Sequence, residues 1–317
     1  MSGPHATLQE ALIIHPGLGA GLARVSAWAG LHYFASRHGF QAPGQDAPGD
    51  DDEAVLTWPQ GNGWLAERLA APLGERLQAA RVVGRIAPDR HGVTVDALHA
   101  PSGRLERWQA RQAVVALPAW LAARVADPAP AALRARAQGL RTAPWLVANL
   151  QLRAPLDDRP GAAPSWDNVL YGAPGLGYVD AMHQSLRPVP GPTVLTYYRA
   201  LGDAPDGRAQ LLARPWTHWR DAIVAELSAA HPDLAAKTER IALVRHGHAM
   251  AVPTPGTLGQ VAALREAVQP RRSARSAELA LAFADAPRLA FAHADWSGYS
   301  VFEEAFTLGH AAGTALG

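Results

Sequence analysis

The chain contains 317 residues, of which 48% are hydrophobic and 18% are charged, and its formal net charge is +1. This length allows two domains or one large domain with an ample core. The near-zero charge gives no indication of binding to nucleic acid or to an anionic membrane surface. The sequence has no cysteine, which excludes disulfides, thiolate catalysis and cysteine-ligated metal. No apolar run approaches the length of a membrane span, and the first residues do not resemble a signal peptide, so we expect a soluble, cytoplasmic protein.

The first 50 residues are predicted to form a leader followed by an apolar helix. Residues 11–15 are typical of a short strand, and the glycine-rich stretch 17–22 follows them. A dinucleotide-binding fingerprint needs a third glycine where Leu22 stands, and it needs an acidic residue at the end of a second strand. Neither requirement is met, so we interpret the stretch as a plain glycine-rich turn or a poorly folded leader. Residues 25–35 are predicted to form the helix.

Residues 51–144 are predicted to form a first α/β segment. A strand near residue 55 leads through a glycine pair into a helix that ends near Gly74. Short strands separated by turns follow at 82–86, 92–97, 105–110 and 113–118. The last of these strands ends in a proline, and a helix over residues 119–125 comes after it.

Residues 145–255 change character, because strands with Pro/Gly-rich loops now dominate. The predicted strands are 145–152, 168–172, 177–182, 193–200 and 241–250. One helix is predicted over residues 215–230, with four apolar side chains at helical spacing: Trp216, Trp219, Ile223 and Leu227. Strands with one covering helix indicate an antiparallel sheet domain of an α+β kind.

Residues 256–317 are predicted to return the chain to the first segment. The apolar run 289–292 is typical of a buried strand, and Asp295 ends it. A small polar turn at 297–300 follows, and apolar residues recur at helical spacing from Val301 onward. A helix that begins there directs unpaired backbone N–H groups, and the positive end of its dipole, at whatever lies above the turn.

Four of these motifs, taken in order, resemble the rear part of flavin-dependent amine oxidases and their relatives. Residues 291–293, Asp295 and 303–305 resemble the strand, acidic residue and helix start of that family's final segment. The strand at 83–86 resembles the one that passes the adenine, and 116–118 resembles the strand end that returns to the cofactor. The resemblance covers about residues 25–317.

The resemblance implies a fold of the α/β plus α+β class. A partial FAD/NAD(P)-binding, Rossmann-like domain would accompany an antiparallel-sheet substrate domain, as in amine oxidases. Two residues depart from the family pattern and narrow the space for a cofactor: His293 replaces a glycine, and Glu304 replaces a small residue. The domain boundaries that we expect are 1–50, 51–144, 145–255 and 256–317.

The resemblance also implies FAD as the cofactor and a pocket for a small-molecule substrate. The residues that it places at the cofactor are Val83, Ala116, Pro118, Asp295, Val301, Phe302 and Glu303. The residues that it places in the substrate pocket are Tyr197, His248, Met250, Trp296 and Tyr299. In that family the acidic residue lies by the ribityl and pyrophosphate groups, and the helix amides face the pyrimidine edge of the flavin.

No catalytic residue is identified from the sequence, and no metal site is predicted. Many amine oxidases place a lysine, through a water molecule, against the flavin N5, but the only lysine here is Lys237, in a polar helix terminus. His246 and His248 would share one face of a strand and could ligate a metal together with His183. No carboxylate or further ligand has diagnostic spacing, so we interpret these histidines as core, loop or pocket residues.

The sequence therefore predicts an FAD-dependent oxidoreductase of the amine oxidase type, which transfers a hydride from its substrate to the flavin. Because the family's glycine fingerprint is not recognised, we expect a truncated or split enzyme. Three explanations are open: the gene model starts late, a separate chain carries the N-terminal FAD-binding half, or the chain is a decayed fragment. The alternative is a catalytically silent binding or partner subunit that keeps the fold. The strands at 114–117 and 289–292 are expected to have open edges, since their neighbours would come from the front part.

Overall fold

The structure is a computed structural model, which describes residues 18–35, 58–159, 165–185, 187, 189–267, 271–273, 276–283 and 286–316. The chain divides into two compact units. Unit 1 comprises Met1–Gly74 and Thr142–Met250, and unit 2 comprises Glu75–Arg141 and Ala251–Gly317. The strands predicted at 11–15 and near residue 55 lie outside the described residues.

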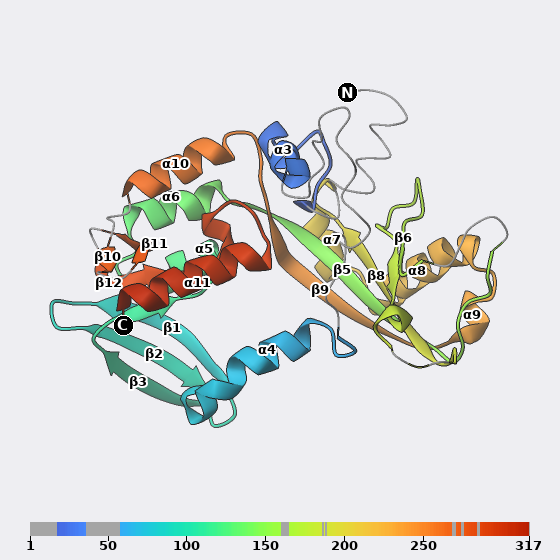
Figure 1. Ribbon diagram of the computed structural model, residues 1–317, viewed down its shortest axis with the longest axis horizontal. Helices are drawn as coiled ribbons and strands as arrows, with labels where there is room; N and C mark the ends of the chain where they lie inside the picture. The colour runs from blue at the N-terminus through green and yellow to red at the C-terminus, as the bar shows by residue number, and fades with distance from the viewer. Residues whose placement is uncertain are drawn as a thin grey trace. The chain divides into compact units, whose positions relative to one another are not determined.

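Unit 1 is built on a five-stranded sheet in the order β6-β7-β8-β5-β9 (Figure 1). Its strands are β5 (Arg141–Leu152), β6 (Asp167–Asn168), β7 (Tyr178–Asp180), β8 (Thr193–Ala200) and β9 (Thr238–Val252). β8 pairs antiparallel with both β5 and β7, which confirms the antiparallel sheet predicted for this part of the chain. Every second side chain of β5 is fully buried from Leu146 to Leu152, as expected of a sheet with one covered face.

Helix α8 (Trp216–Ala230) packs in the core of this sheet and confirms the helix predicted at 215–230. Its Trp219, Ile223 and Leu227 recur every four residues and are buried in one cluster with Leu146. Trp216, which the prediction placed on the same stripe, is 42% exposed. The other helices of unit 1 are α3 (Ala27–Ala35), α4 (Asn62–Ala70), η4 (Ala181–Gln184), α7 (Gly207–Ala213) and α9 (Leu234–Lys237). η3 (Ala71–Arg76) joins the two units.

Unit 2 contains two sheets. The strands β1 (Arg81–Pro88), β2 (Val93–His99) and β3 (Arg104–Ala110) form an antiparallel meander, as the sequence predicts. The second sheet has the order β10-β11-β12-β4 and is formed by β10 (Arg271–Ser273), β11 (Ser276–Phe283), β12 (Ala286–Phe291) and β4 (Ala113–Val115). The helices are α5 (Ala119–Val125), α6 (Ala131–Gly139), α10 (Thr257–Ala267), η5 (Ala294–Trp296) and α11 (Phe302–Leu316).

β12 is covered on both faces. Leu289 and Phe291 are buried in the main core of unit 2 together with residues of α5. Ala290 and Ala292, on the opposite face, pack with Ala312 of α11. A strand covered on both faces needs apolar residues at every position, which explains why the sequence shows a continuous apolar run here.

Among the described residues, the prediction of open strand edges is confirmed for β4 and wrong for β12. β4 is the last strand of its sheet in this part of the chain, and Val114 is 41% exposed. β12 has a neighbour on each side, because it pairs parallel with β4 and antiparallel with β11. The sequence analysis assigned no strand to the residues of β11, which occupy the position expected for a strand from the front part.

Candidate functional site

The candidate site is the edge of the unit 2 sheet at which β4 and β12 both end. The two strands are parallel and pair Val115 with Phe291, so their carboxyl ends meet at the same edge. β4 leads through Ala116 and Pro118 into α5, and β12 leads into η5, which contains Asp295. Ligands of open α/β sheets bind outside the carboxyl ends of parallel strands, which makes this edge the place to look for a cofactor.

Asp295 joins the turns that follow the two strands. The residue is 4% exposed, and its Oδ2 accepts a hydrogen bond from the backbone N–H of Ala119 at 2.9 Å. Ala119 begins α5, whose N-cap is Pro118. A proline side chain cannot accept a hydrogen bond from the unpaired N–H groups of a helix start, so a carboxylate from another segment takes that role. Asp295 is therefore a capping residue for α5.

Asp295 is held in its charged form. Burial by itself would raise the pKa of this carboxyl group. The opposing influences are His293, whose Nδ1 lies 3.4 Å from Oδ1, the N–H of Ala119, and the guanidinium of Arg136. Together they outweigh burial and hold the pKa of Asp295 below its usual value.

Arg136 fixes the main chain of the same turn. The residue is 5% exposed, and its Nε and Nη2 donate to the carbonyl oxygen of Asp295 at 2.9 and 2.5 Å. Its Nη1 donates to Oε1 of Gln260 on α10 at 3.1 Å. Burial lowers the pKa of Arg136, and the charge of Asp295 opposes that shift. Sequence reasoning missed Arg136, although it stands three residues after Leu133, on the buried face of α6.

The glycine-rich stretch near the N-terminus packs against its own unit in its described part, residues 18–22. The backbone N–H of Gly21 donates to a carboxylate oxygen of Asp203 at 2.8 Å. Gly19 has a φ of 75°, and a Cβ added there would lie 2.7 Å from the Cβ of Ala143 on β5. Close packing on β5 therefore accounts for this glycine, and a phosphate bound at Gly21 would meet the carboxylate of Asp203.

Three of the seven predicted cofactor residues lie at this edge: Ala116, Pro118 and Asp295. Ala116 is small and exposed, so its side chain leaves the edge open. Val301 is half-buried just before α11, and Phe302 and Glu303 form the exposed first turn of that helix. Val83 lies on β1 and packs against the main core of unit 2.

The five predicted pocket residues are divided between the two units. Trp296 and Tyr299 belong to unit 2, where they are only 3% and 5% exposed. Trp296 contacts the ring of Phe291, with the ring centroids 5.5 Å apart. The other three predicted pocket residues, which belong to unit 1, are Tyr197, His248 and Met250.

Tyr197 and His248 make different contacts within unit 1. Tyr197 is in the core, and its hydroxyl donates to Oε2 of Glu226 at 3.1 Å. His248 is exposed on β9, where its Nδ1 lies 2.9 Å from Oγ1 of Thr142 and its Nε2 is hydrogen-bonded to Arg208. Burial raises the pKa of Glu226, a residue that sequence reasoning missed.

Two further observations concern the described residues only. Within the described ranges, no group of three or more histidine and carboxylate side chains is arranged to hold a metal ion. No helix among the same residues combines the length and apolar character that a membrane span requires.

The fold identifies the class of structure to which the chain is similar. No family model and no curated protein matches the sequence. Solved structures of amine oxidases do match the fold, with TM-scores above 0.5. Sequence identity to them is 13–17%, so the likeness shows the fold alone.

Three of the matching structures are named as oxidases. Cyclohexylamine oxidase from Brevibacterium oxydans IH-35A matches with a TM-score of 0.61 and 17% identity, over 100% of this chain and 65% of that protein. Putrescine oxidase bound to putrescine matches with a TM-score of 0.54 and 14% identity, over 81% of this chain and 52% of that protein. A protein from Exiguobacterium sp. 255-15, named as a candidate protoporphyrinogen oxidase, matches with a TM-score of 0.55 and 14% identity, over 81% and 51%. The chain thus spans about half to two thirds of the length of these structures.

Proposed function

We propose that this chain is the cofactor-closing and substrate-binding part of an FAD-dependent oxidoreductase of the amine oxidase type. The observation that carries the proposal is the edge of unit 2 at which β4 and β12 end in parallel, joined by the buried carboxylate of Asp295. The likeness of the fold to solved amine oxidases supports the same class of reaction.

The residues at this edge fit the ribityl side of FAD. Asp295 is ionised. Its Oδ2 accepts from Ala119, and its Oδ1, which lies 3.4 Å from Nδ1 of His293, is the oxygen that would accept from a ribityl hydroxyl. Ala116 leaves space beside it, and the first turn of α11 directs backbone N–H groups outward. When bound, FAD would supply the hydride acceptor, and the protein would supply binding, orientation and electrostatics.

The pyrophosphate side of FAD does not fit the described part of the N-terminal stretch. The N–H of Gly21, which a phosphate would need, already binds the carboxylate of Asp203. We therefore propose that a separate chain carrying an N-terminal FAD-binding half supplies the phosphate cradle. The position of β4 as the last strand of its sheet, with Val114 41% exposed, supports a partner at that edge.

The second candidate is a catalytically silent binding or partner subunit. It is favoured by the capping bond from Ala119 to Asp295, which gives that carboxylate a role without any cofactor. The contacts of Lys237 point the same way, because its Nζ lies 2.6 Å from Oδ1 of Asp157 and 2.7 Å from Oδ2 of Asp233. A lysine held in this manner connects α9 to a neighbouring loop and is not a candidate for flavin chemistry.

Flavin binding tests the proposal. The isolated chain is expected to lose FAD on extensive dialysis, since the backbone N–H of Gly21 is bonded to Asp203 and is not available to a phosphate. A chimera that joins the chain to the part of cyclohexylamine oxidase that the chain does not match is expected to retain about one flavin per chain. An amine added without oxygen should then bleach the flavin. A folded chimera that retains flavin but is not bleached by any amine would favour the silent subunit, and an isolated chain that stays yellow would show that the phosphate cradle is already present.

A further inference from the structure

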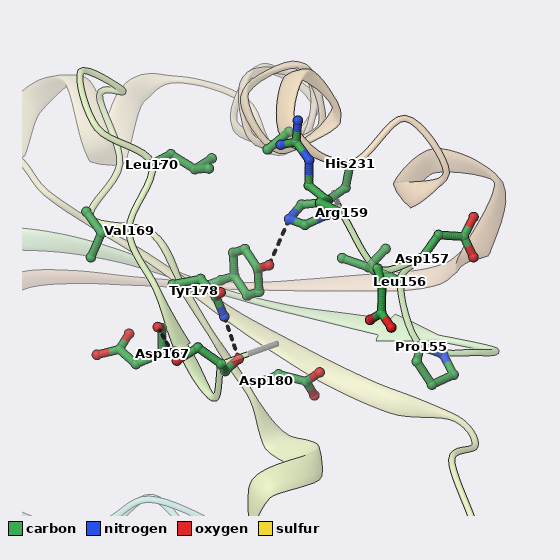
Figure 2. A pocket seen from close by; sticks show the side chains of 14 residues that line it. Pro155, Leu156, Asp157, Arg159, Asp167, Val169, Leu170, Tyr178, Asp180 and His231 are labelled. Carbon is green, nitrogen blue, oxygen red and sulfur yellow. Dashed lines mark hydrogen bonds between the residues drawn. The ribbon is translucent and has the colours of Figure 1, made fainter. Parts of the chain in front are cut away.

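A cavity of about 400 Å³ lies in unit 1, and the proposed function makes no use of it (Figure 2). It is open to solvent on one side and is lined by the loop at 155–159, the strands β6 and β7, the loop after β6, and the C-terminal end of α8. Small-molecule sites in proteins begin at about 300 Å³, so the cavity is large enough for a small ligand. None of the five predicted pocket residues lines it.

A hydrogen-bonded Tyr–His pair forms the polar centre of the wall. Tyr178 is 5% exposed, and its hydroxyl lies 2.8 Å from Nε2 of His231. Figure 2 shows the hydroxyl directed at the imidazole, with Arg159 beside that ring. Burial raises the pKa of Tyr178 to about 12, and burial followed by the charge of Arg159 lowers the pKa of His231. Both groups are therefore neutral near pH 7.

The second nitrogen of His231 decides which partner donates. Nδ1 is buried and has no hydrogen-bond partner among the residues that the structure describes. A buried N–H without an acceptor loses a strong interaction, whereas a buried nitrogen lone pair without a donor is the smaller loss, so the proton belongs on Nε2. Nε2–H then donates to the oxygen of Tyr178, and the hydroxyl hydrogen of Tyr178 is left to donate to a group in the cavity.

The rim of the cavity is acidic. Four carboxylates line it together with the guanidinium of Arg159, and they are Asp157, Asp158, Asp167 and Asp180. The ammonium of Lys237 lies 2.6 Å from Oδ1 of Asp157, so the other three carboxylates supply the net negative charge of the rim. Oδ1 of Asp180 accepts from Thr193 at 2.7 Å, and Oδ1 of Asp167 accepts from Tyr198 at 3.1 Å. Apolar residues make up a further part of the lining: Pro155, Leu156, Val169, Leu170 and Ala230.

We propose that this cavity binds a small organic cation with a hydrogen-bond acceptor one short alkyl chain away from its ammonium group, as in an amino alcohol. The carboxylates of the rim attract the ammonium group, the apolar wall covers the chain, and the hydroxyl of Tyr178 donates to the far oxygen. This assignment does not depend on the proposed oxidoreductase function, because no cofactor residue takes part in it.

Calorimetric titration of the full chain near pH 7 with 4-aminobutanol, n-butylamine and n-butanol tests the assignment. We expect saturable binding of 4-aminobutanol, roughly 5-fold weaker binding of n-butylamine, which lacks the far oxygen, and no binding of n-butanol. Raising the salt concentration should weaken binding of both amines, because the carboxylates are at the exposed rim. Absent saturable binding of 4-aminobutanol, or equal binding of n-butanol, overturns the assignment.

Two variants with matched controls locate the site. Tyr178→Phe keeps the ring and should reduce the affinity for 4-aminobutanol to that for n-butylamine, whose own affinity should not change. Tyr171→Phe, at an exposed position of the same unit, is its control. Asp167→Asn keeps an acceptor for Tyr198 and should weaken the binding of both amines about 3-fold or more. Its control is Asp221→Asn, at the exposed surface of α8, which should leave the affinity for both amines unchanged.

If Tyr178→Phe weakens the binding of both amines equally, or if Asp167→Asn leaves the affinity for both amines unchanged, the ligand does not lie as proposed. Thermal melting of each variant is measured first. Should Tyr178→Phe fail to fold, the comparison of the three ligands on the unaltered chain and on Asp167→Asn still decides the matter.

Discussion

Burial has opposite outcomes for the pKa of one carboxyl group in each unit, Glu226 in unit 1 and Asp295 in unit 2. In unit 1 burial is the largest influence, and it raises the pKa of Tyr178, Tyr197 and Glu226. In unit 2 the neighbours of Asp295 outweigh burial and hold its pKa low, and Arg136 stays charged beside it. In unit 1, burial thus disfavours the charged forms of these groups, whereas unit 2 keeps a buried charge on each side of one turn. Burying a charge costs desolvation free energy, and ionisable groups with shifted pKa values are common at functional sites. The turn at Asp295 is therefore a candidate functional position.

The largest effect is expected from removing the cation of unit 2. Arg136→Met fills a similar volume but leaves the buried carbonyl oxygen of Asp295 without its two donors and removes a positive charge near the carboxylate of the same residue. Leaving a buried polar group unsatisfied costs about 1–3 kcal/mol of the free energy of unfolding. Urea denaturation followed by circular dichroism measures the loss, and hydrogen exchange should place it in unit 2.

Arg134→Met is the control for that variant. Arg134 lies on the same helix but is exposed, so its replacement should cost less than about 1 kcal/mol. Equal losses for the two variants would mean that Arg136 contributes only as a helix residue, and the contrast between the units would disappear.

A smaller loss of stability is expected from changing the residue that caps α5. Asp295→Asn keeps an oxygen that can accept from Ala119 but removes the charge that faces the start of α5. Loss of a helix cap costs about 0.5–2 kcal/mol, and the retained acceptor places the loss in the lower half of that range. The melting temperature in the absence of flavin measures it. A melting temperature unchanged by this variant would argue against capping and leave cofactor contact as the reason for Asp295.

The smallest expected effect is on how the free energy of unfolding depends on pH. Asp295 in unit 2 and Glu226 in unit 1 should contribute to this dependence with opposite signs. The pKa of Asp295 is lower in the folded chain than its unfolded value of about 3.9, so its stabilisation is present above that pH and is lost as the pH falls through the folded pKa. Burial raises the pKa of Glu226 above its unfolded value of about 4.3, so its contribution is present below that pH and is lost as the pH rises through the folded pKa.

Glu226→Gln isolates the contribution of unit 1 to the pH dependence of the free energy of unfolding. The amide keeps an oxygen for the N–H of Gly175 and removes the charge that burial disfavours. The variant should be more stable than the unaltered chain at pH 7, by no more than about 1 kcal/mol, and should show little difference at pH 4. Glu67→Gln, at an exposed position of α4, should show neither change. A loss of stability at pH 7 would mean that the charged form of Glu226 is the favoured one.

Local periodicity predicted the elements that have a covered face. The apolar stripe of α8, the meander of β1 to β3, and the apolar run of β12 were all predicted from the sequence, because each places apolar residues at the period of its element. The strands predicted at 168–172 and 177–182 were too long. β6 ends at Asn168, and Asp180 caps η4 by accepting from the N–H of Met182. A short polar residue that bonds to its own backbone in this way is hard to distinguish from a strand residue by pattern alone.

The interactions across long sequence separations could not be predicted. Asp295 was recognised as a residue of interest from its place between a strand and a helix, but its bond to Ala119 joins residues 176 positions apart. Arg136 is 159 positions from its acceptor, and nothing in the local sequence indicates a partner at that distance. β11 was missed for the same reason, because its pairing with β12 depends on the register between strands.

The central claim is that the edge at which β4 and β12 end holds the flavin through the charge of Asp295. The most direct test is the affinity of the chimera for FAD, measured by flavin fluorescence at a temperature where the chimera and its variants are fully folded. Asp295→Asn is expected to weaken FAD binding about 10-fold, as the loss of a charge-assisted hydrogen bond should, whereas Arg134→Met should leave the affinity unchanged. Equal FAD affinity of Asp295→Asn and the unaltered chimera would contradict the account and would leave Asp295 as a capping residue of α5.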